Sequence, residues 1–320
     1  MDSVENETDM QILQSGRREN AVRKWLAVLF AMLCLLPVFS ACAEDEKMDM
    51  EHYLLIGVDG WGVAKEGGAR SDAIILASLD YGRDRITFTS FARDSIVQPS
   101  YRRNSVKLNT LVRSQEGEGA LIDYIEETFG IPISGHFIIN FSGAVDVLNA
   151  VGGIEIELSQ QEADYVDHHA GYDEKYPLRE GLCRLNGGQA LYYMRCRSLD
   201  NDFGRQGRQG KVLRALVGKL STITPVRALM LVDDVLGMYR TDLAFAAQFE
   251  LAMKALSLRR ADVKTHSLPA EGTYRYGKDS QGASGLEFNL EANRALLYEI
   301  LGIPQETAEQ EETQKVPQAP

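Results

Sequence analysis

Short runs of apolar and β-branched residues, each bounded by glycine or charged residues, recur along the middle of the chain and predict β-strands. The predicted strands are residues 53–58, 73–79, 85–91, 136–141, 154–158 and 263–267. Between and beyond these strands, apolar residues recur at the spacing of a helix. The predicted helices are residues 119–129, 142–151, 186–194, 212–220, 226–238, 243–256 and 289–301. Strands that alternate with helices are typical of a layered α/β domain.

An apolar segment near the N-terminus has a different character. Residues 25–39 are apolar, with basic residues before them and the acidic triplet 44–46 after them. By the positive-inside rule, this pattern places the N-terminus in the cytoplasm and the bulk of the chain outside. The run approaches a membrane span of about 20 residues only when it is extended to residue 43. We therefore expect residues 25–43 to be a single membrane anchor or, alternatively, a lipoprotein signal with Cys42 as the lipidated residue.

Polar sequence flanks the patterned region. Residues 1–24 and 304–320 have little apolar content, so we expect both segments to be disordered, the first of them in the cytoplasm. Residues 44–50 form a short acidic linker. Residues 51–303 contain neither a Pro/Ser-rich linker nor an internal repeat, so we expect one extracytoplasmic domain there.

Composition and charge exclude some functions. The 320 residues are 44% hydrophobic and 25% charged, which is ordinary for a globular protein. A net charge of −12 argues against nucleic acid as a partner, because nucleic-acid binding needs a basic surface. Cys183 and Cys196 could pair in an oxidising compartment or remain free thiols. No Cys/His cluster indicates zinc, and we expect His168 and His169 in a solvent-facing polar loop.

Two carboxylates stand at predicted strand ends. Asp59 directly follows strand 53–58, and Asp72 directly precedes strand 73–79. Strand ends are where open α/β sheets present their ligands, and Mg²⁺ accepts one or two protein carboxylates together with phosphate oxygens. Loop aspartates that only cap turns would have the same spacing, so the pair alone leaves both interpretations open.

The distribution of arginines favours a phosphate-binding site. Arg93 ends a strand, Arg70 stands two residues before Asp72, and a denser group follows between residues 195 and 209. That group consists of Arg195, Arg197, Asp202, Arg205, Arg208 and Gln209. Guanidinium groups bind phosphate oxygens in pairs and stay charged at any physiological pH, so several converging arginines suit a pyrophosphate. The alternative is a solvated, salt-bridged helix start.

The ordered set of these motifs resembles the LytR-CpsA-Psr family of wall-polymer ligases. The resemblance is carried by Leu-Leu-Ile-Gly-Val-Asp59, Arg70-Ser-Asp72-Ala-Ile-Ile-Leu, Ser-Phe-Ala-Arg93-Asp94-Ser, Lys107-Leu-Asn109, Ala-Val-Gly-Gly-Ile-Glu, Leu185-Asn-Gly-Gly-Gln-Ala-Leu, Arg195-x-Arg197 and Asp202-x-x-Arg205-x-x-Arg208-Gln209. Any one of these motifs would be weak evidence, but their order from residue 54 to residue 209 is specific. The chain departs from the family pattern at Gly60-Trp61, at Ala73 and at Phe91-Ala92, which affects loop shape rather than a proposed ligand.

This resemblance implies a three-layer α/β/α sandwich with a central mixed sheet and a long apolar pocket for a polyprenyl chain. It implies that Asp59 and Asp72 hold Mg²⁺ or Mn²⁺ against a pyrophosphate. The implied phosphate contacts are Arg70, Arg93, Lys107, Arg195, Arg197, Arg205, Arg208 and Gln209. The implied catalytic residues are Arg93, Arg195, Arg197, Arg205 and Asp202, of which Asp202 would orient an arginine or help to deprotonate the acceptor. Asp94 is expected to brace its own loop.

The reaction that the resemblance implies is a Mg²⁺-dependent phosphotransfer at the outer face of the cell membrane. A teichoic acid, a capsular or another wall polysaccharide would pass from polyprenyl pyrophosphate to peptidoglycan, with its phosphate. Two alternatives remain at this point: a polyprenyl-pyrophosphate hydrolase, with water as the acceptor, and a non-catalytic regulator that binds polyprenyl phosphate.

Overall fold

The computed structural model describes residues 50–59, 70–113, 117–224, 227, 230–231 and 234–304. Segments 1–24 and 25–43, most of the linker 44–50 and nearly all of the tail 304–320 lie outside these residues, so their predicted states stay predictions. Within the described part of the chain, none of the helices has the length and apolar content that crossing a bilayer requires.

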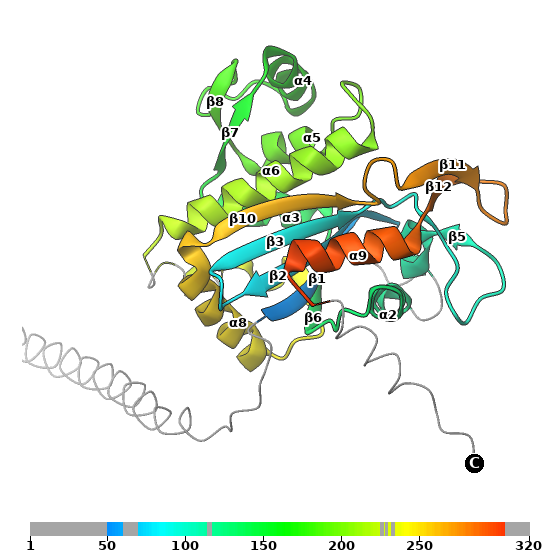
Figure 1. Cartoon of the computed structure of the whole chain (residues 1–320). Coiled ribbons are helices and arrows are strands. Elements are labelled where there is room, and N and C mark those ends of the chain that lie inside the picture. The colour runs from blue at the N-terminus through cyan, green and yellow to red at the C-terminus, as the bar shows by residue number, and fades with distance from the viewer. Residues whose placement is uncertain are drawn as a thin grey trace, which may run out of the picture. The chain divides into compact units, whose positions relative to one another are not determined.

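A mixed sheet of six strands forms the centre of the domain, in the order β10-β3-β2-β1-β6-β9 (Figure 1). These strands are β1 (Met50–Val58), β2 (Ser71–Asp80), β3 (Arg85–Phe91), β6 (Gly135–Ile139), β9 (Tyr239–Thr241) and β10 (Asp262–Leu268). Strand β2 runs antiparallel to both β1 and β3, while β1 is parallel to β6 and β3 is parallel to β10. As a consequence, β1 and β3 end at the same edge of the sheet at which β2 begins.

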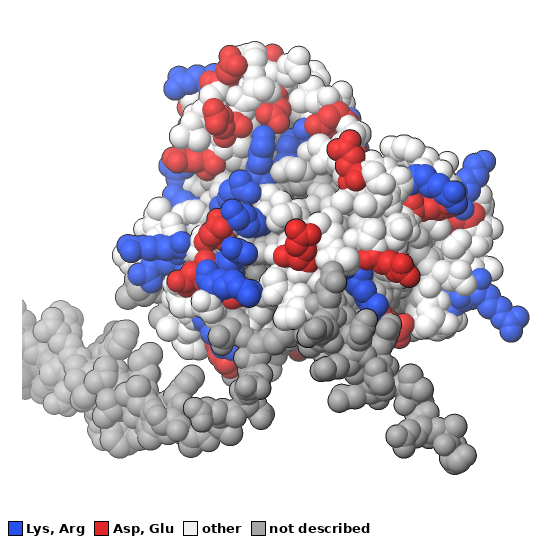
Figure 2. All heavy atoms as spheres, viewed as in Figure 1, with Lys and Arg blue, Asp and Glu red and all other residues white. Residues whose placement is uncertain are grey.

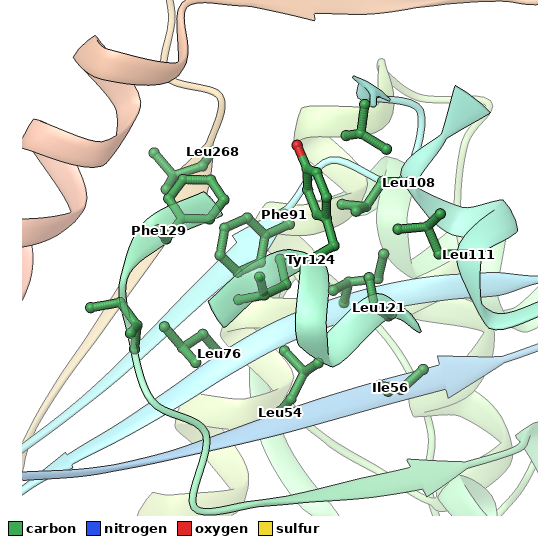
Figure 3. Close-up of a cluster of buried hydrophobic side chains, with 14 of the residues drawn as sticks. Leu54, Ile56, Leu76, Phe91, Leu108, Leu111, Leu121, Tyr124, Phe129 and Leu268 are labelled. Atoms are coloured by element: carbon green, nitrogen blue, oxygen red, sulfur yellow. The ribbon is translucent and has the colours of Figure 1, made fainter. Parts of the chain in front are cut away.

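One face of the sheet is covered by α2 (Glu118–Phe129), α9 (Leu290–Leu301) and the 3-10 helix η2 (Leu108–Arg113). Strand residues alternate between the two faces, so Leu54 and Ile56 of β1 both point to this side. Figure 3 shows them packed with Leu76 of β2 beneath Leu121 and Tyr124 of α2. All five side chains are buried, which makes this cluster the main hydrophobic core.

The opposite face is covered by α3 (Phe141–Ala150), α5 (Gly187–Arg195), α6 (Asp202–Ser221) and α8 (Phe245–Ser257). Beyond α5 and α6, helix α4 (Gln160–Ala170) and the hairpin of β7 (Ile154–Leu158) and β8 (Gly181–Leu185) enclose a second buried cluster. The predicted α/β fold with a central mixed sheet is therefore confirmed. Cys183 and Cys196 are both buried free thiols.

Side-chain caps fix where the helices of this second layer begin. The side chain of Asn140 accepts a hydrogen bond from Gly143 N at the start of α3, and Asn201 accepts from Phe203 N and Gly204 N at the start of α6. In α5 a capping box joins Asn186 to Gln189. Such caps satisfy N–H groups that have no partner inside the helix, so each helix starts at a defined residue.

The structure corrects several predicted elements. Strand β6 ends two residues earlier than predicted, because Asn140 already caps the next helix. His168 and His169 lie in the last turn of α4, so the predicted polar loop is wrong, while both residues are exposed to solvent as predicted. The structure also contains strands that the sequence did not predict: β4 (Ile96–Val97), β5 (Val106–Lys107), β8, β9, β11 (Tyr274–Lys278) and β12 (Ser284–Phe288). The predicted helix 226–238 lies partly outside the described residues.

Candidate functional site

A polar cavity of about 690 Å³ opens at the sheet edge where β1 and β3 end and β2 begins. Six of the predicted site residues line it: Asp59, Arg70, Asp72, Arg93, Arg195 and Arg197. They come from two strand ends, one strand start and the C-terminal end of α5, so the topology gathers residues that are far apart in the sequence. These residues lie together at one edge of the sheet, as their positions at strand ends predict.

Asp72 is the centre of the arginine cluster. Arg93 Nη1 donates a hydrogen bond to Asp72 Oδ1, and Arg197 Nη2 lies 3.5 Å from the same oxygen. Arg205 Nη1 donates to the backbone carbonyl of Asp72 at 2.7 Å. Four arginines and only two aspartates line the cavity, so its lining carries an excess of positive charge that suits a multiply charged anion.

Asp202 holds Arg205 in place from the first turn of α6. Arg205 Nε and Nη2 donate to the two carboxylate oxygens of Asp202 at 2.8 and 3.0 Å. Arg205 is only 2% exposed, and burial lowers the pKa of its guanidinium while the charge of Asp202 opposes that shift. Both oxygens of Asp202 are thus engaged, and its Oδ1 also lies 3.8 Å from Arg93 Nε. In this arrangement Asp202 orients arginines.

Besides Arg205, which lines the neighbouring apolar pocket, three predicted phosphate contacts lie outside the lining of the polar cavity. Lys107 Nζ donates to Asp94 Oδ1 at 2.9 Å, and Asp94 in turn lies 3.6 Å from Arg93 Nε, so Lys107 reaches the cluster only through Asp94. Arg208 is buried, and its guanidinium donates to Asp200 and to the carbonyl oxygen of Cys196. Gln209 lines the neighbouring apolar pocket instead.

Two carboxylates in the cavity suit a divalent cation. Asp59 Oδ1 accepts the backbone N–H of Arg70 at 2.9 Å. Among the described residues, Oδ2 of Asp59 and Oδ2 of Asp72 each have no hydrogen-bond partner, and both residues line the same cavity. In the described ranges, no three or more His, Cys, Asp or Glu side chains are grouped so that they could hold a metal ion, so phosphate oxygens and water would complete the coordination. That donor set fits Mg²⁺ or Mn²⁺.

An apolar pocket of about 320 Å³ lies between the sheet and helices α3, α5 and α6. Its walls include Leu55, Phe137, Val147, Val212 and Leu216. Asp72, Arg195 and Arg197 line both this pocket and the polar cavity, and Arg205 adjoins the apolar side. The guanidinium of Arg195 lies 4.2 Å from the centroid of the Phe141 ring, a cation–π contact at the boundary. The two spaces therefore meet at the arginines.

Aromatic residues on the far wall of the polar cavity were not predicted as site residues. The His169 ring stacks on Tyr165 with a centroid distance of 4.0 Å and lies 6.1 Å from Tyr192. These three rings and Ser198 line the cavity with the arginines. The signal that would have located α4 is its capping box, Ser159-Gln-Gln-Glu162, which the structure forms.

Charged side chains of both signs are mixed on the surface of the protein. Figure 2 shows Lys and Arg side chains interspersed with Asp and Glu over the face that it displays. That face therefore offers no continuous basic surface of the kind that nucleic acid needs.

A protein-family model described as the LytR_cpsA_psr family matches residues 36–295. Among relatives, TagV of Bacillus subtilis is 31% identical over 193 residues, which cover 57% of this chain and 48% of TagV. TagU of Enterococcus faecalis is 31% identical over 223 residues, covering 69% of each chain. Both relatives are named polyisoprenyl-teichoic acid–peptidoglycan teichoic acid transferases. The chain thus spans about half the length of the first relative and about two thirds of the second.

Solved structures agree with the fold. A structure of TagT bound to LIIa-WTA superimposes with a TM-score of 0.65 at 23% identity, covering 82% of this chain and 94% of TagT. The crystal structure of B. subtilis TagV gives a TM-score of 0.62 at 25% identity, covering 81% of this chain and 99% of that chain.

Proposed function

Because the chain belongs to the LytR-CpsA-Psr family, we propose that it is a phosphotransferase that moves a phosphate-linked glycopolymer from polyprenyl pyrophosphate to peptidoglycan. The observation that carries this proposal is the meeting of an apolar pocket and a polar cavity at Asp72, Arg195 and Arg197. A polyprenyl-pyrophosphate glycan has the same order of parts: an apolar chain, a diphosphate and a polar glycan. We place the diphosphate at these shared residues.

The arginines supply the charge stabilisation that the reaction requires. Arg93, Arg195 and Arg197 would contact the diphosphate oxygens, and Arg205, fixed by Asp202, would add charge from the apolar side. When bound, Mg²⁺ or Mn²⁺ held by Asp59 and Asp72 would neutralise phosphate charge. Prepositioned donors of this kind stabilise the charge that develops in the transition state without having to reorganise.

The proposed reaction is a displacement at phosphorus. An acceptor hydroxyl oxygen forms a bond to the lipid-distal phosphorus, and the bond from that phosphorus to the bridging oxygen breaks. Polyprenyl phosphate leaves with the bonding electron pair, the proton of the acceptor hydroxyl passes to solvent or to the departing phosphate, and the glycan keeps the lipid-distal phosphate. Both oxygens of Asp202 already accept hydrogen bonds from Arg205, so we assign Asp202 to positioning rather than to proton transfer.

The test uses the full chain with Mg²⁺, a polyprenyl-pyrophosphate glycan and peptidoglycan oligomers. Mass spectrometry should detect the phosphodiester-linked product, and Arg197→Ala should lower its rate by about 10²–10³. Arg227→Ala is the matched control, because Arg227 has a similarly exposed side chain paired with Asp234 away from the cavity. Free glycan phosphate without a linked product would indicate a hydrolase. Binding without any product would indicate a regulator.

A further inference from the structure

Helix α8 carries a row of large apolar side chains that face solvent. Phe245, Phe249 and Met253 are 62%, 39% and 46% exposed. Their spacing of four residues places them on one side of the helix. On other sides of α8, Leu251 packs against the sheet and Gln248 accepts a hydrogen bond from the Tyr239 hydroxyl at 2.8 Å. The helix is therefore amphipathic, and its apolar row points away from the protein.

The row lies where the chain enters the domain. Lys254, next to Met253, forms a 2.6 Å ion pair with Glu51, the second residue of β1. Only residues 40–49 separate β1 from the apolar segment 25–39, and ten residues span at most about 35 Å. A bilayer that holds this segment would lie within that reach of α8.

The helix also adjoins the apolar pocket. Tyr239 forms part of the pocket wall, and α8 fixes it through Gln248, whose amide also donates to the Leu243 carbonyl at 2.8 Å. Two exposed arginines, Arg259 and Arg260, follow the helix. Glu250 on α8 is paired with Lys254 at 3.0 Å, so the two arginines are the basic groups that remain beside the row. An apolar row followed by basic residues is the pattern of a helix that lies in the interface of a bilayer containing anionic lipids.

We propose that Phe245, Phe249 and Met253 form a membrane-docking face, which rests on the lipid bilayer with its apolar side chains at the boundary between headgroups and acyl chains. The contact itself is independent of the reaction. This contact would also bring a membrane-embedded isoprenoid donor next to the apolar pocket, and that consequence rests on the proposed function.

The first test places a photoreactive benzoylphenylalanine at position 249 of the full chain, in vesicles of phosphatidylglycerol and phosphatidylcholine, without donor or acceptor. Irradiation should attach radiolabelled phospholipid to the protein at this position. The same probe at position 182 is the matched control, because Leu182 is 66% exposed on β8, at the opposite end of the domain from α8 (Figure 1). Equal lipid labelling at both positions would overturn the proposal. So would adducts at position 249 to a second copy or to residues 25–43.

The second test measures transfer by the triple variant Phe245→Ser, Phe249→Ser, Met253→Ser. With a long-chain donor embedded in vesicles, we expect KM to rise about tenfold, since three apolar side chains no longer enter the interface. With a short-chain donor in detergent, the rate should match the unsubstituted chain, which also shows that the variant folds. Equal loss with both donors, or no loss with either, contradicts the docking face. If the unsubstituted chain transfers neither donor while position 249 still labels lipid, only the proposed function fails.

Discussion

At the scale of single residues, the pair of Asp202 and Arg205 shows how the site keeps a cation buried and oriented. Arg205 reaches Asp72 O with one nitrogen and both oxygens of Asp202 with two others, so its three contacts fix the plane of the guanidinium. A buried charge without its partner is costly, so we expect Asp202 to stabilise the fold and, in the proposed reaction, to position Arg205.

We expect Asp202→Asn to lower both activity and stability. The amide would keep one hydrogen bond but lose the charge that holds Arg205. The kcat should therefore fall about 10²-fold, with little change in KM for the lipid donor. The unfolding free energy should drop by about 1–3 kcal/mol. Steady-state kinetics and urea unfolding measure the two effects. Asp200→Asn is the control, because Asp200 pairs with Arg208 outside the cavity lining. A fall in kcat that is no larger for Asp202→Asn than for this control would exclude the positioning role.

His52 gives the protein a predictable sensitivity to acid. It is 1% exposed, its Nδ1 lies 2.8 Å from Ser78 Oγ, and burial lowers its pKa to about 4 from an ordinary value of 6.5. The unfolded chain therefore binds this proton at a higher pH than the folded chain does. The contribution of neutral His52 to the unfolding free energy should therefore be fully present above pH 6.5. It should fall by about 3 kcal/mol as the pH drops to 4.

Urea unfolding of the unsubstituted chain and of His52→Gln, followed between pH 7.5 and 4, checks this prediction. The difference between their pH slopes isolates the histidine, since both chains share every other titrating group. Parallel slopes for the two proteins would show that the buried imidazole does not control acid stability.

At the scale of elements, the crossing of α3 and α5 depends on one glycine. A Cβ at Gly187 would overlap the carbonyl oxygen of Val145, whereas a Cβ at the next residue, Gly188, meets only the Asn186 side chain at an ordinary distance. Both helices line the apolar pocket, so their separation also sets its width. Glycine at position 187 is therefore required by close packing rather than by backbone conformation.

Gly187→Ala should lower the unfolding free energy by about 1–3 kcal/mol, because the added methyl group forces two packed helices apart. Gly188→Ala should be neutral or stabilising by up to about 1 kcal/mol, since alanine favours a helix and has room there. Thermal unfolding of the two variants side by side provides the measurement. Similar melting temperatures for both would mean that the crossing can relax without cost.

The elements also show which parts of the fold the sequence reveals. The predicted bounds of β3 and β7 coincide with the observed ones: Asp84 and Gly153 directly precede these strands, and Ser159, which caps α4, directly follows β7. Helix α4 was missed since its sequence is mostly polar and only Ala163 and Val166 are buried. The places of Asp59, Asp72 and Arg93 at strand ends made their shared sheet edge predictable, although those places alone left a turn-capping role open for the two aspartates. Tyr165 and His169 were not, because their place in the cavity depends on how α4 packs over α5.

At the scale of the whole molecule, the proposed function needs the apolar pocket and the polar cavity to act as one site for an amphiphile. A larger side chain in the pocket should therefore raise KM more for donors with a long apolar chain than for donors with a short one. The arginine cluster would stay intact. Ala144 lines the pocket from α3 but does not line the polar cavity, which makes it a suitable position.

Ala144→Phe should raise KM for a long-chain polyprenyl-pyrophosphate donor about tenfold or more, since one side chain then occupies volume that the isoprenoid needs. A donor with a short chain of two isoprene units should be used at nearly the normal rate, because its diphosphate still meets the same arginines. Ala283→Phe, on the exposed turn between β11 and β12, controls for the added aromatic ring. If Ala144→Phe impaired both donors equally, the loss would reflect general misfolding or a pocket unrelated to the lipid. If it impaired neither, the isoprenoid chain would have to lie elsewhere, and the shared boundary at Asp72, Arg195 and Arg197 would no longer explain how the diphosphate is placed.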